Sequence, residues 1–333
     1  MDDLGGDGVM KALPRLKIAQ LPTPIEPMPR LSTALKGPRM WVKRDDQTGL
    51  AFGGNKTRKL EFLLAEAKAH GAHTLITAGA VQSNHCRQTA AAAARFGFKC
   101  ILVLSGKKPE TISGNLLLDH LFGAEIVWTE AEKRLQVFQE TFERAWEAGK
   151  RPYQIPYGGS NPTGATGYAY AIQEFLGQMQ PDELPGWIVV ASSSGGTQAG
   201  MVAGAKLFGY SGKILGISID ETAQDLAARV ARLASETTEI MGEGQAIQPD
   251  DVLVNDAFLG AGYGIMDKPE QEAIQLFAKQ EGLLLDPVYT GRAGAGLIEL
   301  CRSGFFKAED KVLFWHTGGA TALFAEQYQH VIE

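Results

Sequence analysis

Short apolar runs alternate with longer amphipathic segments over most of this 333-residue chain, and this alternation limits the folds available to it. The apolar runs are typical of buried strands, and the segments between them start at polar residues and often end at glycine, as helices do. We therefore expect strands at 74–78, 100–105, 125–128, near Gln154, and at 187–191, 213–219 and 311–315, with helices at 83–96, 113–122, 132–148, 197–208, 222–235 and 320–328. This order predicts an α/β protein built on parallel sheets.

The composition excludes several classes of protein. Hydrophobic residues make up 44% of the chain and the formal net charge is only -6, which excludes a disordered chain. No basic block occurs, so neither a nucleic-acid partner nor an anionic membrane surface is expected. Two long uncharged stretches, 152–173 and 184–205, are rich in polar residues and glycine and are poor membrane spans. We expect a small-molecule partner.

The three cysteines, Cys86, Cys100 and Cys301, have no CxxC spacing and are odd in number. This pattern predicts neither a disulfide framework nor a cysteine zinc site, and no other metal site is expected. Free cysteines fit a reducing compartment. Residues 1–14 have no apolar run of the kind that a signal peptide carries, so we expect a cytoplasmic protein.

Glycine is frequent, at 39 of 333 residues, or nearly 12%, against about 7% in average proteins. The excess indicates either a loop-rich protein or backbone that approaches a phosphate closely. Ligands of parallel sheets bind beyond the carboxyl ends of the strands. The turns expected there, 79–83, 192–197 and 316–319, are rich in small and polar residues, and we expect the site at these turns.

The segment FGGNKTRKL at 52–60 places two glycines before Asn55 and Lys56, with a helical pattern after them. A solvated basic helix start is the ordinary explanation, although the helix dipole disfavours cations there, and their presence indicates an anionic ligand nearby. Burial lowers the pKa of a lysine, so Lys56 could be a neutral nucleophile that forms a Schiff base.

Two further segments join a strand to a helix. In AGAVQSNHCRQ at 78–88, Ser83 is either a plain N-cap or, with Asn84 and the helix-start amides, a binding site for a carboxylate. His85 is interpreted as a core or surface imidazole, because no partner metal ligand is evident. SSSGGTQAG at 192–200 is either a phosphate-binding turn, in which unpaired amides converge, or an ordinary turn.

Seven segments together resemble the fold-type II pyridoxal phosphate enzymes, in particular the group of D-cysteine desulfhydrase, L-cysteate sulfo-lyase and 1-aminocyclopropane-1-carboxylate deaminase. They are GGNKTRKLEFL (53–63), QSNHCRQTAA (82–91), GNLLLDHLFGAEI (114–126), PYGGSNPTGATGY (156–168), GGTQAGM (195–201), DPVYTG (286–291) and HTGG (316–319). The resemblance implies a tryptophan-synthase-β-like α/β fold with two open, twisted, mostly parallel sheets flanked by helices. It also implies a homodimer and a small α/β domain at 57–157, inserted into a large cofactor-binding domain formed by 1–56 and 158–333.

The resemblance also implies roles for individual residues, with pyridoxal 5'-phosphate as the cofactor. Lys56 would form the Schiff base and, once released, take the Cα proton of the substrate. The other expected cofactor contacts are Lys59, Gly195, Gly196 and Thr197 at the phosphate, Asn84 at the ring hydroxyl and Thr317 at the ring nitrogen. The expected substrate-binding residues are Gln82, Ser83, Asn84, His85, Tyr289 and Thr290, with Ser83, Tyr289 and Tyr263 as further catalytic residues.

Three activities of this group stay open, and we favour β-elimination from D-cysteine to pyruvate, ammonia and sulfide. Ring-opening deaminases have a pattern similar to VYEG where this chain has VYTG, and they lack the threonine of HTGG. This chain has Thr290 and Thr317 at the two positions. L-Cysteate sulfo-lyase would need a cation or several N–H donors near Cβ, which His85 or Arg292 could supply; the alternative for Arg292 is a surface helix residue. A phosphate-binding protein without catalysis is the remaining alternative, and it would not need a Schiff-base lysine.

Overall fold

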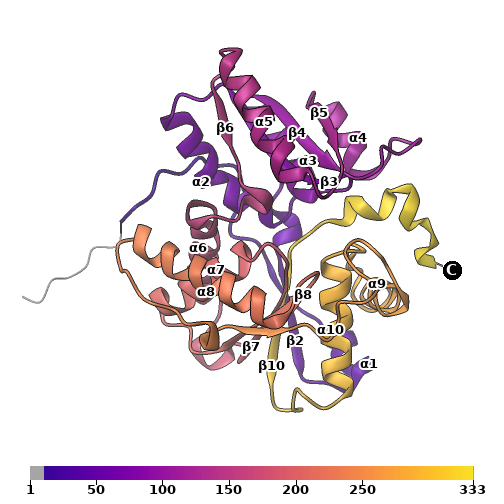
Figure 1. The fold of residues 1–333 in the computed structure, drawn as a ribbon. Coiled ribbons are helices and arrows are strands. Elements are labelled where there is room, and N and C mark those ends of the chain that lie inside the picture. Colours follow the sequence, from indigo (N-terminus) through magenta and orange to yellow (C-terminus); the bar gives the residue numbers. More distant parts are fainter. Residues whose placement is uncertain (1–10, 333) are drawn as a thin grey trace, which may run out of the picture.

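The computed structural model describes residues 11–332 and contains two sheets with helices around them (Figure 1). The six-stranded sheet has the order β1-β2-β10-β7-β8-β9, and the four-stranded sheet has the order β5-β4-β3-β6. The pairing of β1 with β2 is antiparallel, and the other pairings are parallel. The strands are β1 (Ile25–Pro27), β2 (Arg39–Arg44), β3 (Thr74–Ala80), β4 (Lys99–Ser105), β5 (Glu125–Thr129), β6 (Pro152–Gln154), β7 (Trp187–Ser192), β8 (Lys213–Ser218), β9 (Leu253–Asn255) and β10 (Lys311–His316).

Helices connect these strands and cover both faces of the sheets. The α-helices are α1 (Pro29–Leu35), α2 (Asn55–Ala69), α3 (Asn84–Phe96), α4 (Gly114–Leu121), α5 (Arg134–Glu147), α6 (Pro162–Gln178), α7 (Gly196–Phe208), α8 (Ala223–Ile240), α9 (Lys268–Glu281) and α10 (Thr290–Arg302). The 3-10 helices are η1 (Asp45–Gln47), η2 (Leu50–Phe52), η3 (Tyr157–Gly159), η4 (Pro181–Glu183), η5 (Pro249–Asp251), η6 (Ala320–Phe324) and η7 (Glu326–Ile332). Within residues 11–332, every helix is too short or too polar to cross a membrane.

The structure confirms most of the elements expected from the sequence. All seven expected strands are present, as β3, β4, β5, β6, β7, β8 and β10, and five of the six expected helices are present, as α3, α4, α5, α7 and α8. The single helix expected at 320–328 is wrong: Ala325 has extended backbone angles (φ -76°, ψ 140°), so two 3-10 helices form there. The sequence patterns did not predict α1, α2 as a full helix, α6, α9, α10, β1, β2 or β9. Most of 1–14, where no signal peptide is expected, lies outside the described residues.

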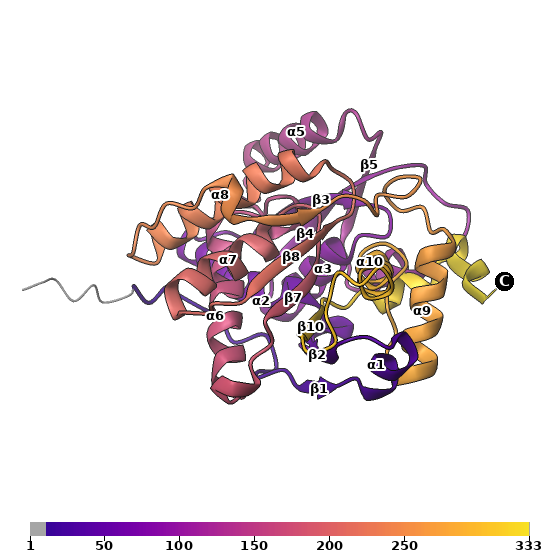
Figure 2. The same ribbon diagram turned by 90° about the horizontal axis from the view of Figure 1, so that it is seen from below.

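The six-stranded sheet is buried on both faces. Along β10, Val312 and Phe314 belong to one hydrophobic cluster, whereas Leu313 and Trp315 belong to another. Alternate residues of a strand point to opposite faces, so the two clusters lie on opposite sides of the sheet. Figure 2 shows α6, α7 and α8 on one side and α1, α9 and α10 on the other. Burial on both faces explains why these strands are continuous apolar runs.

The four-stranded sheet uses only strands from the middle of the chain. Its strands lie between residues 74 and 154, and α3, α4 and α5 connect them. Because this whole sheet falls inside 57–157, we propose these residues as the small inserted domain, with 1–56 and 158–333 as the large domain. The segment 157–167 then carries the chain from one sheet to the other.

A buried ionic cluster fixes helix α2 against the large sheet. The Asp45 carboxylate is fully buried and accepts hydrogen bonds from Arg58 Nε (2.9 Å) and Nη2 (2.8 Å). Arg58 also donates to Glu174 on α6, which in turn accepts from Lys43 Nζ (2.6 Å). Arg58 lies between Lys56 and Lys59 on α2, so the cluster fixes the start of the helix that carries both lysines.

Candidate active site

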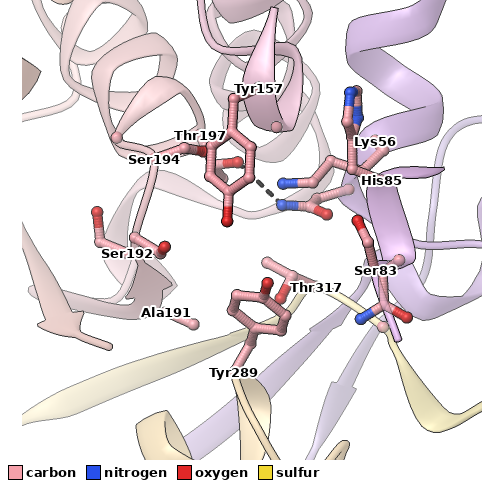
Figure 3. A pocket seen from close by; sticks show the side chains of 16 residues that line it. Lys56, Ser83, His85, Tyr157, Ala191, Ser192, Ser194, Thr197, Tyr289 and Thr317 are labelled. Carbon is pink, nitrogen blue, oxygen red and sulfur yellow. Dashed lines mark hydrogen bonds between the residues drawn. The ribbon is translucent and has the colours of Figure 1, made fainter. Parts of the chain in front are cut away.

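A polar pocket lies where the carboxyl ends of three strands meet the start of α2 (Figure 3). The turns after β3, β7 and β10, at which the site was expected, all contribute to it. Its lining residues are Asn55, Lys56, Ser83, Asn84, His85, Tyr157, Gly158, Ala191, Ser192, Ser193, Ser194, Gly195, Thr197, Tyr289, Thr317 and Gly318. The pocket is therefore built from both sheets.

Lys56 is the second residue of α2, and its side chain extends into the pocket (Figure 3). The loop before it needs glycine: Gly53 has φ +65°, and a Cβ there would lie 2.0 Å from the Asp46 carbonyl oxygen. Burial lowers the pKa of the Lys56 amine to about 8. A substantial fraction of this amine is therefore neutral near physiological pH, as a nucleophile requires.

The lowered pKa of Lys56 gives an expected pH dependence for its reaction with an aldehyde. Only the neutral amine attacks a carbonyl, so the rate should rise about tenfold per pH unit below the pKa and level off above it. We expect the attachment rate of an aldehyde cofactor, followed by visible absorbance, to level off near pH 8. A rate that continues to rise up to the ordinary lysine pKa of 10.5 would contradict this assignment.

The start of α7 forms one wall of the pocket and is suited to an anion. Gly195 is left-handed (φ 82°) at the N-cap, and Gly196 packs against Ser160, where a Cβ would lie 2.6 Å from Oγ. Thr197 Oγ1 accepts a hydrogen bond from Asn55 Nδ2 (3.0 Å). Helix-start amides and the dipole favour negative charge, so this wall could hold a phosphate.

Lys59 supports this wall from behind and does not line the pocket. Its Nζ donates to Gly158 O (3.1 Å) and to Ser160 Oγ (3.2 Å), and Ser160 Oγ also accepts from Gly196 N (3.2 Å). Burial, and then the charge of Lys56, lower the pKa of Lys59 well below its ordinary value. Lys59 thus reaches the phosphate wall through Ser160, a residue to which the sequence analysis gave no role.

Ser83 and His85, at the start of α3, combine structural and site roles. Ser83 Oγ accepts from Cys86 N (3.2 Å), which confirms the N-cap interpretation, and the same side chain lines the pocket. His85 is a core imidazole whose Nε2 lies 2.9 Å from Thr77 Oγ1. Burial, and then the charges of Lys56 and Lys59, hold the pKa of His85 well below its usual range, so its ring is neutral.

Three tyrosines lie at the pocket, two of them in contact on one side and the third across from them. Tyr289 precedes α10 and lines the pocket, and its hydroxyl lies 2.5 Å from that of Tyr263, which lies behind it. Burial raises the pKa of both hydroxyls well above the ordinary value, so both are neutral. Tyr157 faces Tyr289 across the pocket (Figure 3), and the Arg134 guanidinium lies 4.6 Å from its ring centre. Tyr157 was not among the predicted site residues, because no spacing in the sequence links it to the other two.

The contact between Tyr263 and Tyr289 gives a second prediction. Tyr263→Phe should lower kcat by up to about tenfold, because a hydrogen bond of this kind contributes roughly 0.5–1.5 kcal/mol. Affinity for the cofactor should not change, since Tyr263 does not line the pocket. Tyr170→Phe on α6 is the matched control and should behave as wild type. A loss of cofactor affinity in Tyr263→Phe, measured by titration, would show that the hydroxyl has another role.

Two expected substrate-binding residues lie outside the pocket lining. Gln82 Oε1 accepts from Asn115 N (2.8 Å), and Gln82 Nε2 donates to Ser113 O (3.1 Å). Thr290 Oγ1 donates to Asp286 Oδ1 (2.8 Å) and accepts from Asp286 N (2.7 Å). In this arrangement both side chains hold the backbone that presents Ser83 and Tyr289.

Arg292 was interpreted either as a cation near the substrate Cβ or as a surface helix residue. The structure shows that it does not lie at the surface. It is 1% exposed and pairs with Glu270 (Nε to Oε1, 2.7 Å), and its other nitrogens donate to the carbonyls of Ile219, Gly262 and Ile265. All three nitrogens of its guanidinium are therefore used in these contacts, and Arg292 does not line the pocket.

The pocket residues fit a phosphorylated aldehyde of the pyridoxal type. Ser192 Oγ and His85 Nδ1 are buried without a hydrogen-bond partner among the described residues, and both residues line the pocket. Buried polar atoms of this kind normally have a partner, so they indicate a ligand with polar groups. The Lys56 amine suits an aldehyde, and the start of α7 suits a phosphate.

Comparisons with known proteins agree with this arrangement. The family model described as pyridoxal-phosphate dependent enzyme matches residues 16–318. A D-cysteine desulfhydrase of Klebsiella pneumoniae (strain 342) is 42% identical over 318 residues, which cover 94% of this chain and 96% of that protein. A crystal structure described as an ACC deaminase homologue is 35% identical, with a TM-score of 0.88 over 96% of both chains.

Proposed function

The chain belongs to the pyridoxal-phosphate dependent enzyme family, and on this premise we propose that it is a β-elimination lyase that converts D-cysteine to pyruvate, ammonia and sulfide. One observation carries the reaction type: the part-neutral Lys56 amine enters a pocket whose lining, within residues 11–332, contains no Asp or Glu. The 42% identical D-cysteine desulfhydrase supports the choice of substrate.

The cofactor, when bound, would supply an electron sink for the carbanion that forms at the substrate Cα. Lys56 would hold its aldehyde carbon, and Gly195, Gly196 and Thr197 its phosphate, with Lys59 acting through Ser160. Asn84 would face the ring hydroxyl and Thr317 the ring nitrogen. Thr317 offers a neutral hydroxyl there, which does not keep a ring nitrogen protonated as a carboxylate would. Such a site favours substrates with a good leaving group at Cβ.

Side chains and backbone amides of the protein carry out proton transfer and substrate binding. The amine of Lys56 removes the Cα proton, because burial lowers its pKa to about 8 and so makes its neutral form available near neutral pH. Ser83 and the first amides of α3 bind the substrate carboxylate. Tyr289 presents a neutral hydroxyl, hydrogen-bonded to Tyr263, on the other side of the pocket, where it can donate to the departing sulfur.

The charges at the pocket also favour a thiol over a sulfonate as the leaving group. Neither of the two residues considered as a cation for binding a sulfonate is suited to that role. Arg292 is paired with Glu270, and His85 is held neutral. A ring-opening deaminase is the second candidate, supported by the overall similarity to the ACC deaminase homologue.

The test is a product assay on purified protein with D-cysteine, L-cysteine, L-cysteate and 1-aminocyclopropane-1-carboxylate. We expect equal amounts of sulfide and pyruvate from D-cysteine. Sulfite from L-cysteate without sulfide from D-cysteine would replace the proposal by a sulfo-lyase, and 2-ketobutyrate from the cyclopropane substrate alone would replace it by a deaminase. A protein that binds the cofactor but forms none of these products would be a binding protein.

We also propose a homodimer in the cytoplasm. The free state of Cys86, Cys100 and Cys301, all buried, supports a reducing compartment. Sedimentation of the purified protein tests the dimer.

A further inference from the structure

We propose that Arg87 is a positioning residue: together with Asn115 it fixes the side-chain amide of Asn84 so that only its NH2 group faces the pocket. Arg87 also places behind that group a positive charge that has no ion-pair partner among residues 11–332. The inference rests on the proposed function, because it concerns the side of the pocket at which Asn84 would face the ring hydroxyl of the cofactor.

The hydrogen bonds of the Asn84 amide fix its orientation. Its Oδ1 accepts from Arg87 Nη1 (2.9 Å) and from Asn115 Nδ2 (2.9 Å), so both lone pairs are used. The amide nitrogen therefore lies on the other side, next to Gly319. A Cβ added to Gly319 would come within 2.7 Å of this Nδ2. Asn84 lines the pocket and therefore presents a donor, and not an acceptor, to a ligand.

Asn115 is itself fixed by the same network. Its Oδ1 accepts from Arg87 Nη1 (2.8 Å) and from Thr321 Oγ1 (2.6 Å), while its Nδ2 also donates to Gln82 O (2.8 Å). Arg87 Nη1 can only donate and Gln82 O can only accept, and this excludes the flipped orientation of either amide. A single orientation of the Asn84 donor follows.

Arg87 also connects segments that are distant in the chain. It lies on α3, and its Nη2 donates to Gly53 O (2.9 Å) in the loop before Lys56. Its Nη1 contacts Thr321 on η6, near the C-terminal end of the described residues. Arg87 thus ties the Asn84 donor to the loop that carries the lysine.

The charge of Arg87 has no carboxylate partner within residues 11–332 at ion-pair distance. Burial lowers its pKa to about 10, so the guanidinium is still charged at neutral pH. The carboxyl group of Asp119 is the first of the charged groups that raise the pKa of Arg87, but it makes no ion pair with Arg87, and burial raises its own pKa well above the ordinary value. Asp286 also acts on Arg87, and its carboxylate accepts from the amides of Val288, Tyr289 and Thr290.

An unpaired buried guanidinium is costly, and a purely structural contact would not require it. Behind an amide donor, the charge strengthens the hydrogen bond to an anionic acceptor, such as an ionised ring hydroxyl. The network is therefore suited to distinguish a ligand with that oxygen from one without it.

The experiment compares pyridoxal phosphate with the analogue that lacks the ring hydroxyl, and measures both dissociation constants by quenching of protein fluorescence. Wild type should prefer pyridoxal phosphate by about 10- to 100-fold, as expected for a hydrogen bond to a charged group. Arg87→Lys keeps a charge but cannot hold Asn84 and Gly53 together, and should reduce the preference to about threefold or less. Arg87→Met should do the same.

Arg292→Lys is the matched control, because Arg292 is equally buried and also lies outside the pocket lining, but it contacts Glu270 and not Asn84. It should keep the wild-type preference. If Arg87→Met does not fold, Arg87→Lys carries the comparison alone.

The outcomes separate this inference from the proposed function. If Arg87→Lys weakens both ligands by the same factor, Arg87 is only structural and the inference is wrong. If wild type binds both ligands equally, the inference is wrong while cofactor binding stands. If wild type binds neither ligand, both the inference and the proposed function are overturned.

Discussion

Lys56→Ala is expected to lower the rate of sulfide release from D-cysteine by about 10³-fold or more. The substitution removes both the nucleophile for the cofactor aldehyde and the base for the Cα proton, and a positioned acid-base group alone contributes roughly 10²- to 10⁴-fold. The visible absorption of the bound cofactor that borohydride abolishes in wild type should also be missing. Both effects can be measured on one preparation by absorbance and by a sulfide assay.

Lys68→Ala is the control, because Lys68 is an exposed lysine at the other end of the same helix. It should keep both the absorption and the activity. Full activity in Lys56→Ala, or a borohydride-sensitive band at wild-type strength, would rule out Lys56 as the reactive lysine and would also remove the main support for the proposed lyase.

The second large effect is expected from Arg58→Met, which should lower the free energy of unfolding by about 3–5 kcal/mol. The substitution leaves the Asp45 carboxylate fully buried without its counter-charge, although Thr23, Tyr168 and Trp315 still donate to it. Because Arg58 stands between Lys56 and Lys59 on α2, cofactor affinity should fall as well. Urea unfolding and cofactor titration measure the two effects.

Arg39→Met provides the comparison, because it breaks an ion pair with Glu183 in which the two side chains are 60% and 42% exposed. Such exposed pairs contribute about 1 kcal/mol or less. Equal losses in the two variants would show that the buried cluster has no special importance for stability.

The same cluster predicts the effect of acid. Burial raises the pKa of Asp45, but the charge and hydrogen bonds of Arg58 outweigh it and lower the pKa to about 2. The unfolded chain has the ordinary value of 3.8, so the stabilisation is complete above that pH and is lost as the pH falls toward 2. The stability difference between wild type and Arg58→Met should shrink over this range.

Whether a helix could be predicted from the sequence depended partly on whether it keeps an exposed polar face. Helices α5 and α8 have a polar face, and their periodicity was visible in the sequence. Helix α6 is buried along most of its first half, so the amphipathic pattern that identifies a surface helix is weak in its sequence. Local patterns cannot identify such helices, because the burial comes from neighbouring elements.

The candidate site shows the same limit. Lys56, Ser83 and the glycine turn before Thr197 carry local signals, and the structure brings them into one pocket. Tyr157 and Arg87 do not carry such signals, because their importance comes from partners that are distant in the sequence. The sequence left open whether Arg292 is a cation of the site or a surface residue for a related reason: its partner Glu270 is 22 residues away and equally buried.

The pocket is lined by residues from both sheets, and this affects how a ligand stabilises the protein. A ligand that contacts Ser83 after β3 and Thr197 and Thr317 after β7 and β10 joins both sheets at once. Its binding free energy is available only while the two sheets keep their relative position, so it acts as a reversible cross-link. The cofactor would then be part of the cooperative folding unit as well as a reagent, and separating the two halves would require its release.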